Sequence, residues 1–113
     1  MQIVEARQDG VHVVAPAGRI DTTTAGAVET SLASALSGPS PRLVVDLSAV
    51  DYISSAGLRV LLVAARRVQT SGGRLALCAL SPPVRQVFEL AGFLPLFTIQ
   101  ETRAAAVARL ASP

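Results

Sequence analysis

The sequence predicts a single α/β domain with a mixed, mostly parallel β-sheet, an N-terminal hairpin and about four helices. The chain has 113 residues, of which 50% are apolar and 16% charged, a composition that suits one domain with a buried core. A hairpin turn pair, Asp9-Gly10, joins two strand-like segments at the start. After it, strand-length apolar runs alternate with segments of helical period, so the predicted order is β-β-α-β-α-β-α-β-α over residues 1–113.

The first two strands are predicted at Gln2–Gln8 and Val11–Ala15, on either side of the turn. His12, the only histidine, falls inside the second strand with no acid or nucleophile beside it in sequence. We interpret it as an ordinary strand side chain. The following residues, Pro16–Asp21, are expected to lead the chain out of the sheet.

The first helix has several candidate N-caps in Asp21-Thr22-Thr23-Thr24 and is expected to run to about Ser37. Gly38-Pro39 then ends it. Asp21 is at least a cap or turn residue. If the strands before Asp21 and Asp46 are parallel neighbours, the two carboxylates lie at the same edge of the sheet.

The central segment predicts a buried strand, Leu43–Val45, that stops at Asp46 and passes through a loop into a helix. Asp46 is most simply a turn former at the end of that strand. The helix is indicated by apolar residues at helical spacing (Leu58, Leu61, Leu62 and Ala65), while Arg59 and Arg66 fall on another face.

Two adjacent serines mark the start of this helix. Ser54 is predicted to be the N-cap, because Ile53 and Leu58 then form the hydrophobic-staple pair. Ser55 becomes the first helical residue, and its hydroxyl is free to face solvent. Either Ser55 is a spare surface residue, or it is a phosphorylation site, since a helix N-terminus tolerates an anion.

The C-terminal part predicts two more strands and two more helices. Arg74–Leu80 is nearly all apolar, as expected of an internal parallel strand. Ser81-Pro82-Pro83 opens a helix that Gly92 closes. A short strand at Leu96–Ile99 precedes a last helix from about Thr102 to Leu110.

Several functions are disfavoured by what the sequence lacks. It has no lysine, no phosphate-binding glycine loop and no glycine before either serine, so an enzyme, including a serine hydrolase, is not expected. Cys78 is the only cysteine, which predicts a buried thiol, no disulfide and no metal centre. Scattered arginines with one tyrosine argue against direct nucleic-acid binding. No membrane span or signal peptide is apparent, so a cytoplasmic protein is expected.

Four segments resemble the STAS family, specifically the bacterial anti-sigma factor antagonists: Gly18–Asp21, Val44–Ser48, Tyr52–Leu58 and Cys78–Val84. The resemblance implies that Ser55 is the phosphorylated serine, with Ser54 the second candidate. It also implies an anti-sigma factor partner that is itself a GHKL-type serine kinase. The unmodified antagonist holds this kinase and frees a sigma factor; phosphorylation ends the interaction and a metal-dependent phosphatase restores it. Family members often have aspartate where this chain has Ser54.

The partner is expected to dock over the loop ends, on Asp21, Thr22, Asp46, Ser54, Ser55, Ala56, Gly57, Leu58 and Arg59. The small residues Ala56 and Gly57 would allow a close approach of its backbone, although Gly57 is also explained by clearance between helix and sheet. No cofactor is expected. The alternative function is a STAS scaffold that is not phosphorylated, such as a cytoplasmic subunit of a lipid-transporting ABC system or part of a stressosome-like assembly.

Overall fold

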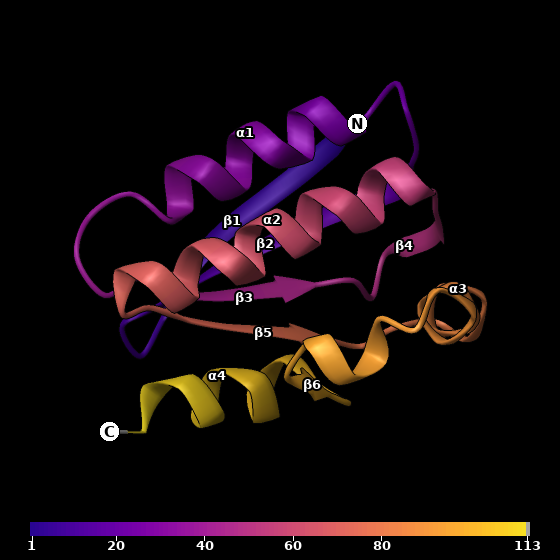
Figure 1. Ribbon diagram of the computed structural model, residues 1–113. Helices are drawn as coiled ribbons and strands as arrows, with labels where there is room; N and C mark the ends of the chain where they lie inside the picture. The colour runs from indigo at the N-terminus through magenta and orange to yellow at the C-terminus, as the bar shows by residue number, and fades with distance from the viewer. Residues whose placement is uncertain (113) are drawn as a thin grey trace.

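The computed structural model describes residues 1–112 and shows a six-stranded mixed sheet with helices on both faces (Figure 1). The strand order is β1-β2-β3-β5-β6, and β4 pairs with β2. This confirms the predicted α/β class. The elements are β1 (Gln2–Gln8), β2 (Val11–Ile20), α1 (Ala25–Ala35), β3 (Arg42–Asp46), β4 (Val50–Ile53), α2 (Ser55–Ser71), β5 (Arg74–Cys78), α3 (Pro82–Ala91), the 3₁₀ turn η1 (Leu94–Leu96), β6 (Ile99–Gln100) and α4 (Arg103–Ala111).

The helices cover the two faces unequally. Helices α1 and α2 lie side by side on one face, α4 lies on the other, and α3 packs near β4 (Figure 1). Side chains alternate across the strands, so neighbouring residues such as Val44 and Val45 enter different cores. The larger core lies beneath α1 and α2, and the smaller one lies beneath α4. Within residues 1–112, no helix is long and apolar enough to cross a membrane.

The N-terminal hairpin is confirmed, with Gln8 paired to Val11 around the predicted turn. Asp9 and Gly10 both have positive φ, 52° and 78°, as the two central residues of a type I′ turn require. However, β2 does not end at Ala15, because its pairing with β1 continues to Ala17 and the strand runs to Ile20. The prediction that residues 16–21 leave the sheet was therefore wrong.

The long strand β2 has two successive parallel neighbours. Its first part, His12–Val14, pairs with β3, and its last part, Gly18–Ile20, pairs with β4. The register shifts between Gly18 and Arg19, and Gly18 has a φ of +98° that favours glycine. Strand β4 was not predicted, because only its ends, Val50 and Ile53, are buried and four residues are too few to show a period.

Three other boundaries differ from the predictions. Helix α1 has Thr24, one of the predicted candidates, as its N-cap, but it ends at Ala35, two residues before Ser37. Strand β5 ends at Cys78, and Ala79 turns with a positive φ of 59°. The strand predicted at Leu96–Ile99 is mostly absent: η1 takes the chain around Pro95 to Leu96, and β6 has only two residues.

The last two helices start as predicted. Helix α3 has Pro82 as its first residue, and Gly92 closes it with a φ of 72°. The Ser81 hydroxyl donates to the carbonyl of Val50 at 3.1 Å, which ties α3 to β4. In α4, the side chain of Thr102 accepts a hydrogen bond from the N–H of Ala105 at 3.1 Å.

Candidate functional surface

The candidate surface is formed where β2 and β4 end side by side. Ile20 pairs with Ile53, and the next N–H along the chain, that of Ser54, donates to the Ile20 carbonyl at 2.8 Å. The turn after β2 and the start of α2 are therefore neighbours, although they lie more than thirty residues apart in sequence. Carboxyl ends of parallel strands commonly carry binding sites in α/β sheets.

Ser54 is the N-cap of α2, as predicted. Its backbone is extended, with φ −91° and ψ 174°, and its Oγ accepts a hydrogen bond from the N–H of Gly57 at 3.3 Å. Its carbonyl accepts from the N–H of Leu58 at 3.0 Å, which starts the helix. The Ser54 hydroxyl therefore has a structural partner.

Ser55 is the first residue of α2, also as predicted, and its side chain is exposed. Its hydroxyl makes no hydrogen bond to any of residues 1–112. Arg59 lies one helical turn further along α2 and is exposed as well. Residues four apart on a helix lie on the same face, so an anion at Ser55 would have a guanidinium within reach.

Two residues of the expected docking surface are instead core residues. An added Cβ at Gly57 would lie 2.7 Å from Ile20 Cγ2 and 2.7 Å from Ile53 Cγ1. Gly57 therefore lets α2 approach the ends of β2 and β4; it does not make room for a partner. Leu58 is 4% exposed and packs in the larger core. Neither residue is available to a docking protein.

Asp21 and Thr22 lie in the turn between β2 and α1. Asp21 Oδ1 accepts from the Thr23 hydroxyl at 2.7 Å and from the Thr23 N–H at 2.9 Å. These two bonds hold the pKa of Asp21 below its ordinary value. The carboxylate is half-buried and shapes the turn, whereas Thr22 is exposed.

Sequence reasoning missed a cation–π pair at this edge. The guanidinium carbon of Arg19 lies 4.1 Å from the centre of the Tyr52 ring, on the adjacent strand. The Arg19 side chain is 61% exposed, and its Nε lies 3.8 Å from Asp21 Oδ2. Cation–π pairs at exposed sites contribute about 0.5–1 kcal/mol. Without β4, the sequence gives no sign that Arg19 and Tyr52 are neighbours.

A shallow groove between α1 and α2 continues this surface and was also missed. Its volume is about 230 Å³, and it is lined by Ala25, Gly26, Glu29, Ala56, Arg59, Val60 and Val63. The Val63 side chain is 52% exposed and adds apolar surface to the groove. Ala56 therefore belongs to an apolar strip beside Ser55.

Asp46 has a different environment from the other predicted docking residues. It is 5% exposed, and its Oδ2 accepts from Arg103 Nε on α4 at 2.7 Å. Its Oδ1 accepts from the N–H of Ser48 at 2.9 Å, as expected of a turn former. Burial raises the pKa of Asp46, but the bonds from Ser48 and Arg103 outweigh that effect and leave it below its ordinary value. Asp46 therefore anchors α4 and does not belong to the docking surface.

Replacing Asp46 by asparagine is expected to lower the free energy of unfolding by about 1 kcal/mol at pH 7. A fully buried charge-assisted hydrogen bond would contribute more than this to the free energy of unfolding. Here Arg103 is one-third exposed, so solvent screens the pair. Because the folded pKa is lowered, this stabilisation is present above the ordinary value of 3.8 and disappears as the pH falls below it.

Urea unfolding at pH 7, 5 and 3 measures this difference. Asp51→Asn is the control, since Asp51 is an exposed acid in β4. A deficit of the Asp46→Asn variant that stays constant down to pH 3 would contradict this role for the carboxylate.

Cys78 lies beside this ion pair and is fully buried. Burial, together with the nearby Asp46 carboxylate, raises the pKa of its thiol to about 12. The thiol therefore stays protonated and unreactive at neutral pH. Among residues 1–112, no three His, Cys, Asp or Glu side chains come together as a metal site would require.

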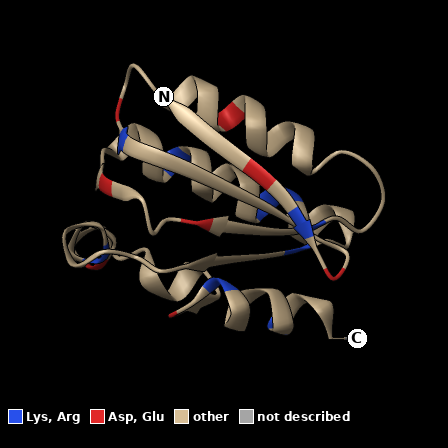
Figure 2. Cartoon of the chain, turned by 180° about the vertical axis from the view of Figure 1, so that it is seen from behind, with Lys and Arg blue, Asp and Glu red and all other residues tan. Residues whose placement is uncertain are grey.

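Charged residues are interspersed over the rest of the molecule, with Arg and acidic positions on both layers (Figure 2). Residues 2–106 match the family model described as the STAS domain, and the chain belongs to this family.

Two similar proteins are described as anti-sigma factor antagonists. The chain is 40% identical over 108 residues to the "Putative anti-sigma factor antagonist BtrV" of Bordetella bronchiseptica, which covers 96% of this chain and 93% of that protein. The crystal structure of an anti-sigma factor antagonist from Mycobacterium paratuberculosis superposes with a TM-score of 0.88 at 30% identity, over 98% of this chain and 94% of that one.

The Bacillus protein SpoIIAA has been solved in two forms. The unphosphorylated form superposes with a TM-score of 0.77 at 20% identity, over 96% of this chain and 95% of that one. The phosphorylated form superposes with a TM-score of 0.70 at 19% identity, over 96% of this chain and 98% of that one. At this identity the likeness shows the shared fold alone.

Proposed function

We propose that this chain is an anti-sigma factor antagonist regulated by phosphorylation of Ser55. In its unmodified form it binds an anti-sigma factor that is also a GHKL-type serine kinase, and a sigma factor is released. Phosphorylation of Ser55 ends this interaction, and a serine phosphatase reverses it. Such a protein acts in the cytoplasm. The observation that carries the proposal is the exposed Ser55 hydroxyl, without a hydrogen bond to residues 1–112, at the first position of α2.

The position suits a modification that leaves the fold intact. A phosphate adds a charge of about −1.5 to −2, and an anion at a helix N-terminus gains about 0.3–1 kcal/mol from the helix dipole. Ser54 is the poorer acceptor, because its hydroxyl already caps the helix through Gly57. The aspartate that family members often carry before the serine is replaced here by another good N-cap, so the helix start is kept.

The proposed partner surface is smaller than the sequence indicated. It comprises exposed and half-buried residues around Ser55, and it gains Arg19 and Val63, which sequence reasoning did not include. Its members are Arg19, Thr22, Ser55, Ala56, Arg59 and Val63, with Asp21 and Ser54 shaping the loops beneath. Its charged and apolar members give a partner both ion-pair and hydrophobic contacts.

Phosphate mapping tests the choice between the two serines. We expect that incubation with ATP and the anti-sigma factor kinase of the same genome places one phosphate on Ser55. Ser55→Ala should abolish the modification. Ser54→Ala should retain it but lower the free energy of unfolding by about 1 kcal/mol through loss of the cap. Mass spectrometry locates the phosphate, and thermal unfolding measures the stability that Ser54→Ala loses with the cap.

A phosphate on Ser54, or on neither serine, would contradict the proposal. If no kinase of the genome modifies the chain and it co-purifies with a permease and an ATPase instead, the scaffold function replaces it.

A further inference from the structure

Strand β5 is paired along only part of its outer side. Toward β3, the N–H of Arg74 donates to the Pro41 carbonyl at 2.8 Å, so even-numbered residues face that strand. Toward β6, the N–H of Leu77 donates to the Thr98 carbonyl at 2.8 Å. Leu75 faces the same way as Leu77, yet β6 pairs only with residues 77 and 78. Within residues 1–112, the backbone N–H and C=O of Leu75 therefore have no hydrogen-bond partner.

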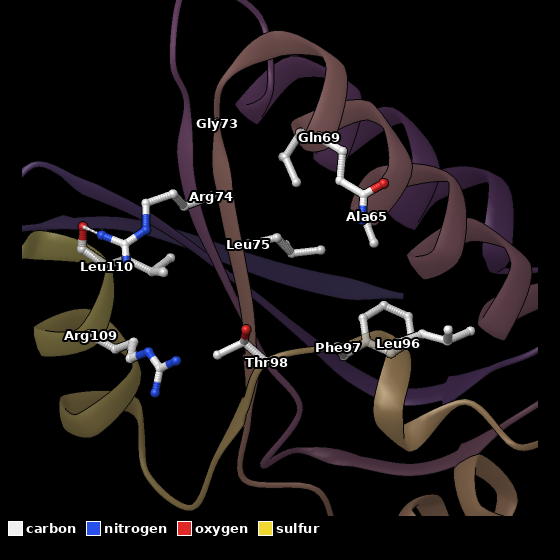
Figure 3. A pocket seen from close by; sticks show the side chains of 11 residues that line it. Ala65, Gln69, Gly73, Arg74, Leu75, Leu96, Phe97, Thr98, Arg109 and Leu110 are labelled. Carbon is white, nitrogen blue, oxygen red and sulfur yellow. Dashed lines mark hydrogen bonds between the residues drawn. The ribbon is translucent and has the colours of Figure 1, made fainter.

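This open edge forms the floor of a groove between the two helical layers (Figure 3). The groove has a volume of about 240 Å³. Its wall on the α2 side is mostly apolar, with Ala65, Val68 and Phe97, and carries one polar side chain, Gln69 (Figure 3). Its wall on the α4 side carries Arg74 and Arg109 (Figure 3).

The two arginines have different positions. Arg74 donates to the carbonyls of Leu110 at 3.3 Å and of Ser112 at 2.7 Å, so it fastens the end of α4. Arg109 is exposed and makes no ion pair with residues 1–112. No Asp or Glu lines the groove. Its charge is therefore positive on one side only.

We propose that this groove, Leu75 with its two walls, binds an extended acidic segment of a partner protein, which adds to the sheet as a strand beside β5. One residue of the segment would exchange hydrogen bonds with the N–H and C=O of Leu75. Side chains of a strand alternate, so apolar residues would face α2 and acidic residues would face Arg109. The bound segment has an alternating apolar and acidic sequence.

This surface is separate from the one proposed for the kinase. The groove lies where β5 begins, at the opposite end of the parallel strands from the start of α2 (Figure 1). A second protein can therefore occupy it while Ser55 is engaged or modified. The inference does not depend on phosphorylation and goes beyond the proposed antagonist function.

Two NMR measurements on the full chain test it. Amide hydrogen exchange comes first: the N–H of Leu75 should exchange at least tenfold faster than that of Leu77, which is hydrogen-bonded. The second is a titration with the peptide acetyl-Val-Glu-Val-Glu-Val-Glu-amide. We expect shifts confined to Leu75, Thr98, Arg109 and their neighbours, with the Leu75 amide proton moving downfield.

The controls separate strand addition from charge alone. Arg109→Glu should weaken peptide binding at least tenfold, and Arg85→Glu, on the remote helix α3, should not change it. The same peptide with lysine for glutamate should not bind, and neither should a blocked Val-Val-Val-Glu-Glu-Glu isomer. The proposal would be overturned if the Leu75 N–H exchanged as slowly as that of Leu77 in the absence of peptide. Equal binding of the isomer, or no chemical-shift changes at millimolar peptide, would overturn it as well. Self-association through Leu75 would also overturn it, by assigning the edge to a second copy.

Discussion

Gly57→Ala is expected to destabilise the fold by about 2 kcal/mol, although alanine is the better helix former. Helix propensity alone would favour the change by about 1 kcal/mol. Against this, the new Cβ would lie 2.7 Å from Ile20 Cγ2 and 2.7 Å from Ile53 Cγ1, both in the larger core. Overpacking of a filled core costs about 1–3 kcal/mol, and two contacts at 2.7 Å place this substitution at the upper end of that range. Because both neighbours end strands that hold the sheet together, we expect overpacking to dominate.

Gly26→Ala is the matched control, since Gly26 also lies in a helix and nothing lies within 4 Å of its Cβ position. It should stabilise the chain by up to about 1 kcal/mol. Thermal unfolding then gives shifts of opposite sign, about 8 °C downward for Gly57→Ala and a few degrees upward for Gly26→Ala. Two shifts of the same sign would show that propensity, and not the contact with Ile20 and Ile53, decides the outcome at residue 57.

The features of the fold that the sequence predicted correctly are the local ones. Local signals predicted α2, α3 and α4: Ser54 and its staple in α2, Pro82 with Gly92 in α3, and an alanine-rich sequence with apolar Val107 and Leu110 in α4. The sequence also separated the roles of Ser54 and Ser55, since capping is a local interaction. These features depend on residues within a few positions of one another.

Features that depend on pairing between distant segments were missed. The four residues of β4 form a strand only because β2 extends past its pairing with β3 and offers Gly18–Ile20 as an edge. Without that strand, the Arg19–Tyr52 pair cannot be inferred. Asp46 was predicted to lie on the docking surface. Its structural role could not be inferred, because its partner, Arg103, lies 57 positions later in the chain. Gly57 and Leu58 share a short motif with Ser55, but the helix turns them inward.

The largest effect is expected at Ser55 itself. If the proposed antagonist function is correct, Ser55→Ala should bind the kinase tightly with or without ATP, while Ser55→Asp should bind at least a hundredfold more weakly. That factor corresponds to about 2.7 kcal/mol. The cause is a charge placed in the partner interface, where it is desolvated without a matched cation from the partner. Within the free chain, the same charge gains slightly from the helix dipole and from Arg59 one turn away.

The two variants therefore separate binding from folding. Both should unfold within about 1 kcal/mol of the unmodified chain, while calorimetric titration against the kinase distinguishes them and release of the sigma factor follows the titration. Ser71→Asp is the control for added charge, because Ser71 is the exposed last residue of the same helix and lies far from Ser55. It should leave kinase binding unchanged. Equal affinities for Ser55→Ala and Ser55→Asp would mean that a charge at the start of α2 does not regulate the interaction, even if the kinase binds there.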